Sequence, residues 1–159
     1  VFHSWQGLGY YSRARNLHKA AIEIVKKWDG KVPSSFADLC SLPGIGTYTA
    51  GAILSFAFLQ RAAAVDGNVI RVMSRYFAVQ ENVDQKKIRN DLEKRTLAFL
   101  DVGSPWMTSE ALIELGALIC RPKPDCNQCP LQDSCLANKQ KIAETLPVKN
   151  GRQSVTVLK

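Results

Sequence analysis

Four cysteines in the C-terminal third of the chain are the residues best suited to chemistry. They form a C-x5-C-x2-C-x5-C array made of Cys120, Cys126, Cys129 and Cys135. A short four-cysteine run with a central C-x2-C suits an iron–sulfur cluster, whereas structural zinc sites more often join two separated pairs of ligands. Crowded disulfides are a further alternative, but the chain shows no secretory segment. The array therefore predicts a cluster, with zinc and disulfides left open.

The chain is basic, which favours an anionic partner. The sequence has twenty-one Lys and Arg residues and fourteen Asp and Glu residues, which give a net charge of +7 and a pI near 9.3. Nucleic acid is the commonest such partner, although many basic proteins merely stay soluble this way. Arg121 and Lys123 lie inside the cysteine array, where we expect them to contact DNA. No run of about 18 apolar residues offers a membrane span.

A glycine-rich turn between two expected helices could bind phosphate. Its sequence is LPGIG, residues 42–46. Glycines can adopt positive φ and let the backbone approach a ligand, and the free N–H groups that start the next helix can bind an anion. Such a turn is often only a tight connection. In a basic chain it predicts a helix–hairpin–helix whose DNA-binding residues are Leu42, Gly44, Gly46 and Thr47, with Thr47 as a possible helix cap.

The elements that position these residues are all expected to be helices. Apolar residues recur at helical spacing, and no stretch alternates convincingly with period two. A face of small residues between positions 49 and 55 would let another backbone approach closely. One strand-like piece, residues 153–158, has no evident partner. The expected helices cover residues 17–28, 36–42, 47–59, 66–76, 85–99 and 108–120.

Four motifs in order now resemble a known family. LPGIG, TAGAI, VDGNVIRV and LGALIC have the layout of the helix–hairpin–helix base-excision DNA glycosylases. Residues 5–17, WQGLGYYSRARNL, resemble the adenine glycosylases of the MutY family. The resemblance implies an all-α glycosylase region at 1–119, a 4Fe–4S cluster loop at 120–136, and a tail at 137–159 towards an absent C-terminal domain.

The resemblance also assigns catalytic roles. Asp66 matches the family aspartate that acts at the sugar, where a carboxylate can stabilise the positive charge built up as the N-glycosidic bond breaks. Asp66 could equally be the N-cap of the next helix, and the two roles are compatible. Asn68 is expected to hydrogen-bond near Asp66, or only to satisfy the helix start.

Two tyrosines complete the expected site. Glycosylase/lyases of the endonuclease III kind carry a Schiff-base lysine at the position of Tyr48, and a phenol cannot form that imine. The chain should therefore release the base without cutting the strand. Tyr10 matches the residue that wedges into the duplex beside the lesion. The structural alternatives are a half-buried helix aromatic for Tyr48 and a core aromatic for Tyr10.

The resemblance thus implies removal of adenine mispaired with 8-oxoguanine or guanine in double-stranded DNA. We expect a monomer that works in the bacterial cytoplasm, or in a nucleus or mitochondrion. Three features depart from the family. The first gap in the cysteine array is one residue shorter, and Ser109-Glu110 stands where the family often has Asn-Gln. The general-acid glutamate of the family belongs to a helix that would precede Val1, so we expect this chain to lack it. The alternatives are a thymine-mismatch or oxidised-pyrimidine glycosylase of the same superfamily, and an inactive iron–sulfur DNA-binding fragment.

Overall fold

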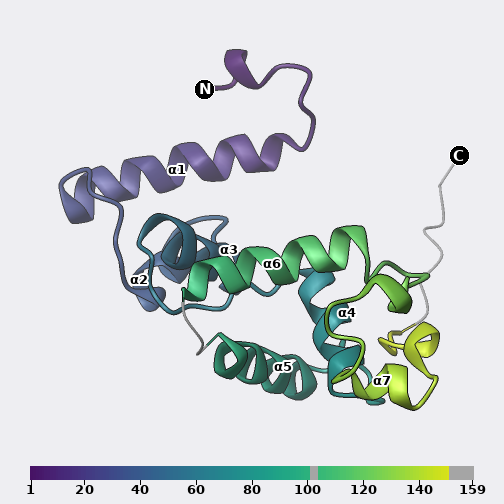
Figure 1. The fold of residues 1–159 in the computed structure, drawn as a ribbon. Coiled ribbons are helices and arrows are strands. Elements are labelled where there is room, and N and C mark those ends of the chain that lie inside the picture. The colour runs from purple at the N-terminus through teal and green to yellow at the C-terminus, as the bar shows by residue number, and fades with distance from the viewer. Residues whose placement is uncertain (101–103, 151–159) are drawn as a thin grey trace, which may run out of the picture. The chain divides into compact units, whose positions relative to one another are not determined.

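The computed structural model describes residues 1–100 and 104–150, and within them its regular elements are all helical (Figure 1). The expected all-α class is confirmed. The chain divides into two compact units, Val1–Ala64 and Val65–Lys159. The strand-like piece at 153–158 lies outside the described residues. Among the described helices, none is long and apolar enough to cross a membrane.

The first unit is built from three α-helices and two short turns. Ser35 caps α2, because its Oγ accepts the Asp38 N–H at 3.1 Å. Asp29, with a left-handed φ of 49°, ends α1. The core consists of Ala20, Leu39, Leu42, Ala50 and Leu54. The elements are η1 (His3–Trp5), α1 (Tyr11–Trp28), α2 (Phe36–Ser41), α3 (Thr47–Ala52) and η2 (Ile53–Ala57).

The expected 47–59 helix is regular only as far as Ala52, where it passes into the π-helical turn η2. The change follows Gly51, over which the returning chain passes. A Cβ on Gly51 would lie 2.1 Å from the Ala63 carbonyl oxygen. The expected close approach of another backbone to this small-residue face is confirmed.

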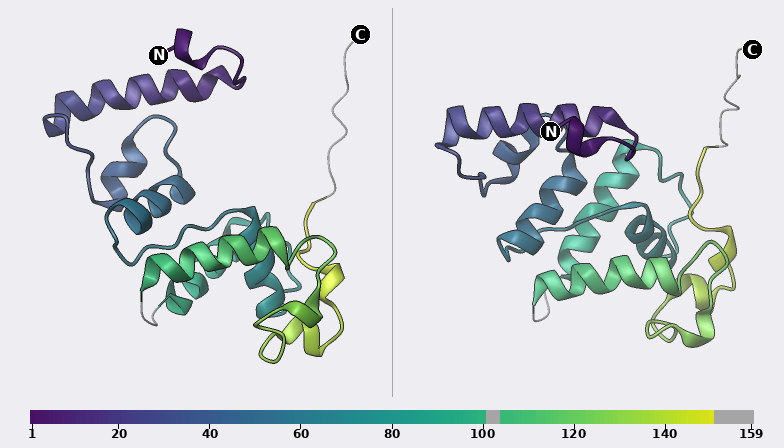
Figure 2. Two further views of the ribbon diagram at one scale, coloured as in Figure 1. Left: turned by 45° about the horizontal axis from the view of Figure 1, so that its top comes forward. Right: turned by 90° about the horizontal axis from the view of Figure 1, so that it is seen from above.

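The second unit is centred on α4, which packs against α5, α6 and α7 (Figure 2). Its buried apolar residues include Val69, Met73, Leu92, Leu112 and Ala137. The C-terminal end of α6 leads into the cysteine loop beside α7 (Figure 1). The elements are α4 (Gly67–Tyr76), α5 (Lys86–Phe99), α6 (Pro105–Leu118), η3 (Cys126–Gln128), α7 (Leu136–Lys139) and η4 (Ala143–Thr145).

The expected bounds of α6, residues 108–120, need correction at both ends. The helix begins at Pro105, whose fixed φ suits the first helical position and whose missing N–H is not needed there. It ends at Leu118, and the Cys120 N–H then bonds to the Leu115 carbonyl oxygen at 2.7 Å. Cys120 is therefore a loop residue, and its thiol belongs to the cysteine loop rather than to the helix.

Candidate active site and cysteine loop

Asp66 is the N-cap of α4 and its carboxylate is held at both oxygens. Oδ1 accepts the Val69 N–H at 2.8 Å, and Oδ2 accepts the Asn68 side-chain amide at 3.1 Å. Asp66 and Asn68 are both half-buried. The expected hydrogen bond of Asn68 beside Asp66 is confirmed, and so is the capping role of Asp66. A carboxylate oxygen has two lone pairs, so each oxygen keeps capacity to face a cation.

A chain of hydrogen bonds links this carboxylate to the cysteine loop. Asn68 Oδ1 accepts from Arg71 Nη2 at 2.9 Å, while Arg71 Nε donates to the Cys120 carbonyl oxygen at 2.7 Å. Arg71 Nη2 also donates to the Gly116 carbonyl oxygen at 2.7 Å. A Cβ on Gly116 would lie 2.6 Å from the Asn68 Cβ, so α6 and the start of α4 meet where only glycine fits.

In the first unit, the two hairpin glycines serve different purposes. Gly44 has a φ of 80°, and a Cβ there would lie 2.6 Å from the Asn16 Cβ of α1. Gly46 has a φ of −95°, so the positive φ that we expected of it is not used. Instead Gly46 is the N-cap of α3, which corrects the expected cap at Thr47, and a Cβ there would meet open space.

The other hairpin residues divide between the core and the surface. Leu42 is only 2% exposed and belongs to the core, so its side chain anchors the turn rather than facing outward. Thr47 is the first residue of α3 and is exposed. Tyr48, 42% exposed, follows it. In the described residues, no side chain caps α3, so the N–H groups of its first turn are free of a side-chain acceptor.

Tyr10 projects from a braced loop in front of α1. The residue has a left-handed φ of 45°, and 82% of it is exposed, which excludes the core-aromatic alternative. Trp5 Nε1 donates to the Gly9 carbonyl oxygen at 3.1 Å. The Arg13 guanidinium lies 5.4 Å from the Trp5 ring centroid and 5.6 Å from that of Tyr10, within cation–π range.

All four cysteines of the array line one small cavity, together with Arg75. The four thiols are half-buried and unpaired by disulfides, so the disulfide alternative finds no support. Among the described residues, no group of three or more His, Cys, Asp or Glu side chains is arranged to hold a single metal ion. Four thiols around one cavity are consistent with the expected iron–sulfur cluster.

The environment of two of these thiols, Cys126 and Cys129, raises their pKa and so favours the neutral form. Burial raises the pKa of Cys126, and repulsion from the other three cysteines raises it further. Burial also raises the pKa of Cys129. Arg75 acts in the opposite direction on the pKa of Cys126, as a nearby cation stabilises a thiolate. Arg121 and Lys123, at the rim of the loop, are exposed.

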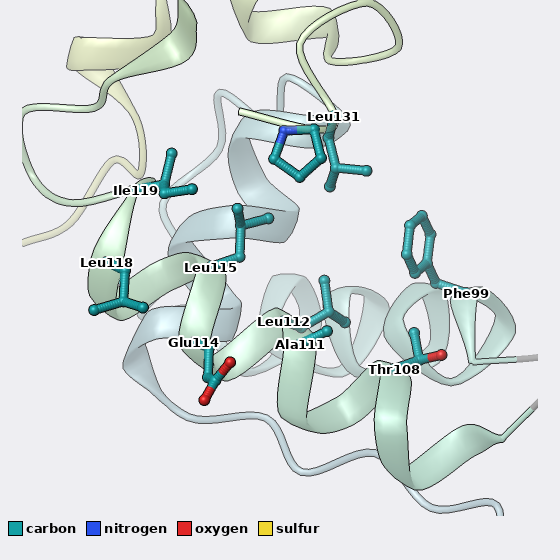
Figure 3. A pocket seen from close by; sticks show the side chains of 10 residues that line it. Phe99, Thr108, Ala111, Leu112, Glu114, Leu115, Leu118, Ile119 and Leu131 are labelled. Atoms are coloured by element: carbon teal, nitrogen blue, oxygen red, sulfur yellow. The ribbon is translucent and has the colours of Figure 1, made fainter. Parts of the chain in front are cut away.

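An apolar pocket of about 300 Å³ lies elsewhere on the second unit (Figure 3). Residues of α6, the end of α5 and the cysteine loop line it, among them Phe99, Leu112, Leu115, Leu118 and Leu131. Neither Asp66 nor any cysteine of the array is part of this lining. The pocket is therefore separate from the residues to which the sequence pointed.

Comparison with known proteins decides the family. The profile of the HhH-GPD superfamily, base excision DNA repair proteins, matches residues 1–96. The chain belongs to the HhH-GPD superfamily. Similar members include the adenine DNA glycosylase of Buchnera aphidicola subsp. Baizongia pistaciae, 43% identical over 136 residues, which cover 85% of this chain and 38% of that protein. The human adenine DNA glycosylase is 40% identical over 144 residues, 89% of this chain and 26% of that protein.

Solved structures of the superfamily share the fold. A thermostable thymine-DNA glycosylase matches with a TM-score of 0.71 and 30% identity, over 80% of this chain and 59% of that one. Endonuclease III in a non-covalent DNA complex matches with a TM-score of 0.67 and 31% identity, over 86% and 62%. The expected glycosylase fold is confirmed. The chain spans about two fifths of the length of the bacterial relatives it matches.

Three residues that join α4 to α6 and to the cysteine loop were not predicted from the sequence. Arg71 and Arg75 sit four residues apart on α4 and reach the cysteine loop, and Gly116 lets α6 approach Asn68. The available signal was two arginines four residues apart on a helix that also carries Val69, Ile70, Val72 and Met73, since long cations rarely lie on a buried face without a role.

Proposed function

We propose that this chain is the greater part of the catalytic region of an adenine DNA glycosylase. It would hydrolyse the N-glycosidic bond of adenine mispaired with 8-oxoguanine or guanine in double-stranded DNA. The observation that carries the proposal is the Asp66 carboxylate, fixed at both oxygens, in a chain about 40% identical to proteins named adenine DNA glycosylase.

Asp66 is the residue proposed to act on the sugar. As the bond between adenine and deoxyribose breaks, positive charge grows on the sugar ring, and a fixed carboxylate stabilises it without first having to reorganise. One carboxylate about 4 Å from a cation contributes roughly 4 kcal/mol at an effective dielectric near 20, or about three decades in rate. Asn68 orients the carboxylate through the bond at 3.1 Å.

Tyr48 sets the reaction type in this proposal. A lysine amine at this position would form a Schiff base and cut the strand, and a phenol cannot. Release of the base therefore ends the reaction, which makes the enzyme monofunctional. The proposed product is an intact strand with an abasic site.

DNA is held by groups that do not read its sequence. The hairpin of Gly44, Gly46 and Thr47 would approach a phosphate, since a Cβ on Gly46 would meet open space and the N–H groups of α3 carry no side-chain cap. Leu42 contributes by anchoring the hairpin. Tyr10, exposed at the tip of its loop, would insert beside the extruded adenine and offset part of the unstacking cost.

The four cysteines are proposed to hold a 4Fe–4S cluster. Such a cluster would fold the loop and present Arg121 and Lys123 to phosphate, rather than transfer electrons in the reaction. The thiols of Cys120, Cys126, Cys129 and Cys135 fit the group because they surround one cavity.

Thymine-mismatch repair is the second candidate, because a thymine-DNA glycosylase shares the fold at a TM-score of 0.71. A panel of duplexes separates the two. The full gene product containing this chain would be incubated with adenine opposite 8-oxoguanine, guanine or thymine, and with thymine opposite guanine, and the free bases quantified. Adenine released opposite 8-oxoguanine and guanine supports the proposal, and thymine as the main product refutes it.

A further inference from the structure

Arg75 is a buried cation that meets no carboxylate. It lies on α4 with 2% of its surface exposed, and within the described residues no carboxylate is within ion-pair distance of it. Isolated charges are rarely buried unless an opposite charge or many hydrogen bonds compensate them. The hydrogen bonds of Arg75 therefore indicate what its charge is for.

The acceptors of Arg75 come from the cysteine loop and the segment that follows it. Nη1 donates to the Arg121 carbonyl oxygen at 2.6 Å and Nη2 to that of Pro122 at 2.9 Å. Nε donates to the Leu146 carbonyl oxygen at 2.9 Å. Nη1 also lies 3.3 Å from both the carbonyl oxygen and the Sγ of Cys120. One guanidinium thus holds the backbone that follows the first cysteine and donates to its sulfur.

The backbone of Arg75 reaches the last cysteine of the array. Its carbonyl oxygen accepts from Cys135 Sγ at 3.5 Å, and Arg75 lines the cavity that all four cysteines surround. Cys120 and Cys135 are 15 positions apart in the sequence, so a single residue of α4 lies beside both ends of the array. The Cys135 contact needs a protonated thiol and would be lost once Cys135 binds iron as a thiolate, whereas the N–H···S contact to Cys120 would be kept.

We propose that Arg75 is the buried counter-cation of the iron–sulfur centre: it positions Cys120 and donates an N–H···S bond to the anionic cluster, so that cluster retention and reduction potential both depend on it. This inference rests on the proposed cluster. Hydrogen bonds to sulfur and nearby charge are among the factors that set such potentials. A fixed cation favours the more negative, reduced state, and so raises the potential.

Two substitutions separate the charge from the geometry. Lysine keeps the positive charge, but its three donors share one nitrogen and cannot span the carbonyl oxygens that the guanidinium fork reaches. Methionine fills much of the same space without charge or donors. Arg89→Met is the matched control, because Arg89 is exposed on α5 and its one ion pair within the described part of the chain is a 3.9 Å contact with Asp84.

The test uses the chain reconstituted anaerobically with ferrous iron and sulfide. Iron per chain, the rate of iron loss to a chelator, and the reduction potential by voltammetry are measured for each variant. Arg75→Met should lose about 10-fold or more in iron retention, and any remaining cluster should have a more negative potential. Arg75→Lys should keep a potential near that of the unmodified chain but lose iron faster, and Arg89→Met should change nothing.

Each outcome decides one point. Unchanged iron retention and potential in Arg75→Met would overturn the proposal, while leaving the cluster itself intact. A potential in Arg75→Lys that shifts as far as in Arg75→Met would also overturn it, because charge would then not be the contribution. If circular dichroism shows that Arg75→Met does not fold, the proposal is judged on Arg75→Lys, which should lose iron faster while its reduction potential stays near that of the unmodified chain. An unmodified chain that takes up no iron refutes the proposed cluster, and this inference with it.

Discussion

At Asp66, the bonds that start a helix also fix a charge. The Val69 N–H and the Asn68 amide hold one carboxylate oxygen each, so the group is oriented before any substrate binds. Arg71 then holds Asn68 from the other side. The geometry that caps the helix would therefore also serve the proposed catalytic role. A substitution separates the two roles only if it keeps the cap and removes the charge.

Asp66→Asn is that substitution. Asparagine is also a good N-cap, so the free energy of unfolding should fall by less than for Asp66→Ala, which we expect to cost about 1 kcal/mol. Base release should be abolished in Asp66→Asn while binding to the mismatched duplex persists, because the carboxylate serves the transition state more than the ground state. Chemical denaturation and single-turnover assays on the full gene product measure the two effects. Full base release by Asp66→Asn would exclude Asp66 from catalysis.

Among the secondary-structure elements, most helices could be predicted from the sequence because the residues that begin and end them act locally. Asp29, Ser35 and Asp66 end or begin helices through their own backbone or side chain, and such signals can be read in one dimension. The π-helical turn after Ala52 has no comparable local signal. It occurs where the chain near Ala63 returns over Gly51, a contact that depends on tertiary structure.

The candidate site was likewise predictable only in part. The four cysteines and Gly44 were proposed as site residues from their residue types and spacing, whereas Asp66 was proposed from the resemblance to the glycosylase family. Arg71 and Arg75 were missed, because in the sequence an arginine on a helix resembles a solvated side chain. Only the folded second unit shows that carbonyl oxygens of the cysteine loop surround their guanidinium groups.

Two glycines near α3 give a matched pair of predictions. Gly51→Ala should lower the free energy of unfolding by roughly 2 kcal/mol or more, because the new Cβ would lie 2.1 Å from a backbone oxygen. Gly46→Ala should lower it less, by at most about 1 kcal/mol, since a Cβ there meets open space and only the N-cap preference for glycine over alanine is lost. If the hairpin approaches phosphate, however, Gly46→Ala should weaken DNA binding. Equal stability losses, or unaltered DNA affinity in Gly46→Ala, would contradict these roles.

For the molecule as a whole, the net charge is the property that fits the proposed DNA partner. The net charge of +7 is large for 159 residues and suits binding to a polyanion. Arg121 and Lys123 are exposed on the cysteine loop, shortly after Cys120. In the proposal, the loop brings these charges to the DNA backbone, which gives affinity without sequence preference.

Replacing both residues by alanine tests that link. For each phosphate that is no longer neutralised, the slope of log affinity against log salt should fall by about 0.9, so Arg121→Ala/Lys123→Ala should flatten it by about 1.8. Binding should weaken alike for matched and mismatched duplexes. Lys86→Ala/Lys87→Ala at the exposed start of α5 removes the same charge elsewhere on the second unit. An unchanged slope in the loop variant, or equal flattening in both, would show that the cysteine loop does not contact DNA specifically.

The most direct test of the proposed reaction follows one labelled DNA strand. The full gene product is incubated with a duplex carrying adenine opposite 8-oxoguanine, and strand length is determined before and after alkali, with and without borohydride. We expect an intact strand that breaks only in alkali, no borohydride-trapped adduct, and free adenine in equal amount. Strand cleavage at the rate of base loss, with a trapped adduct, would contradict the assignment, because an amine nucleophile would then define the reaction.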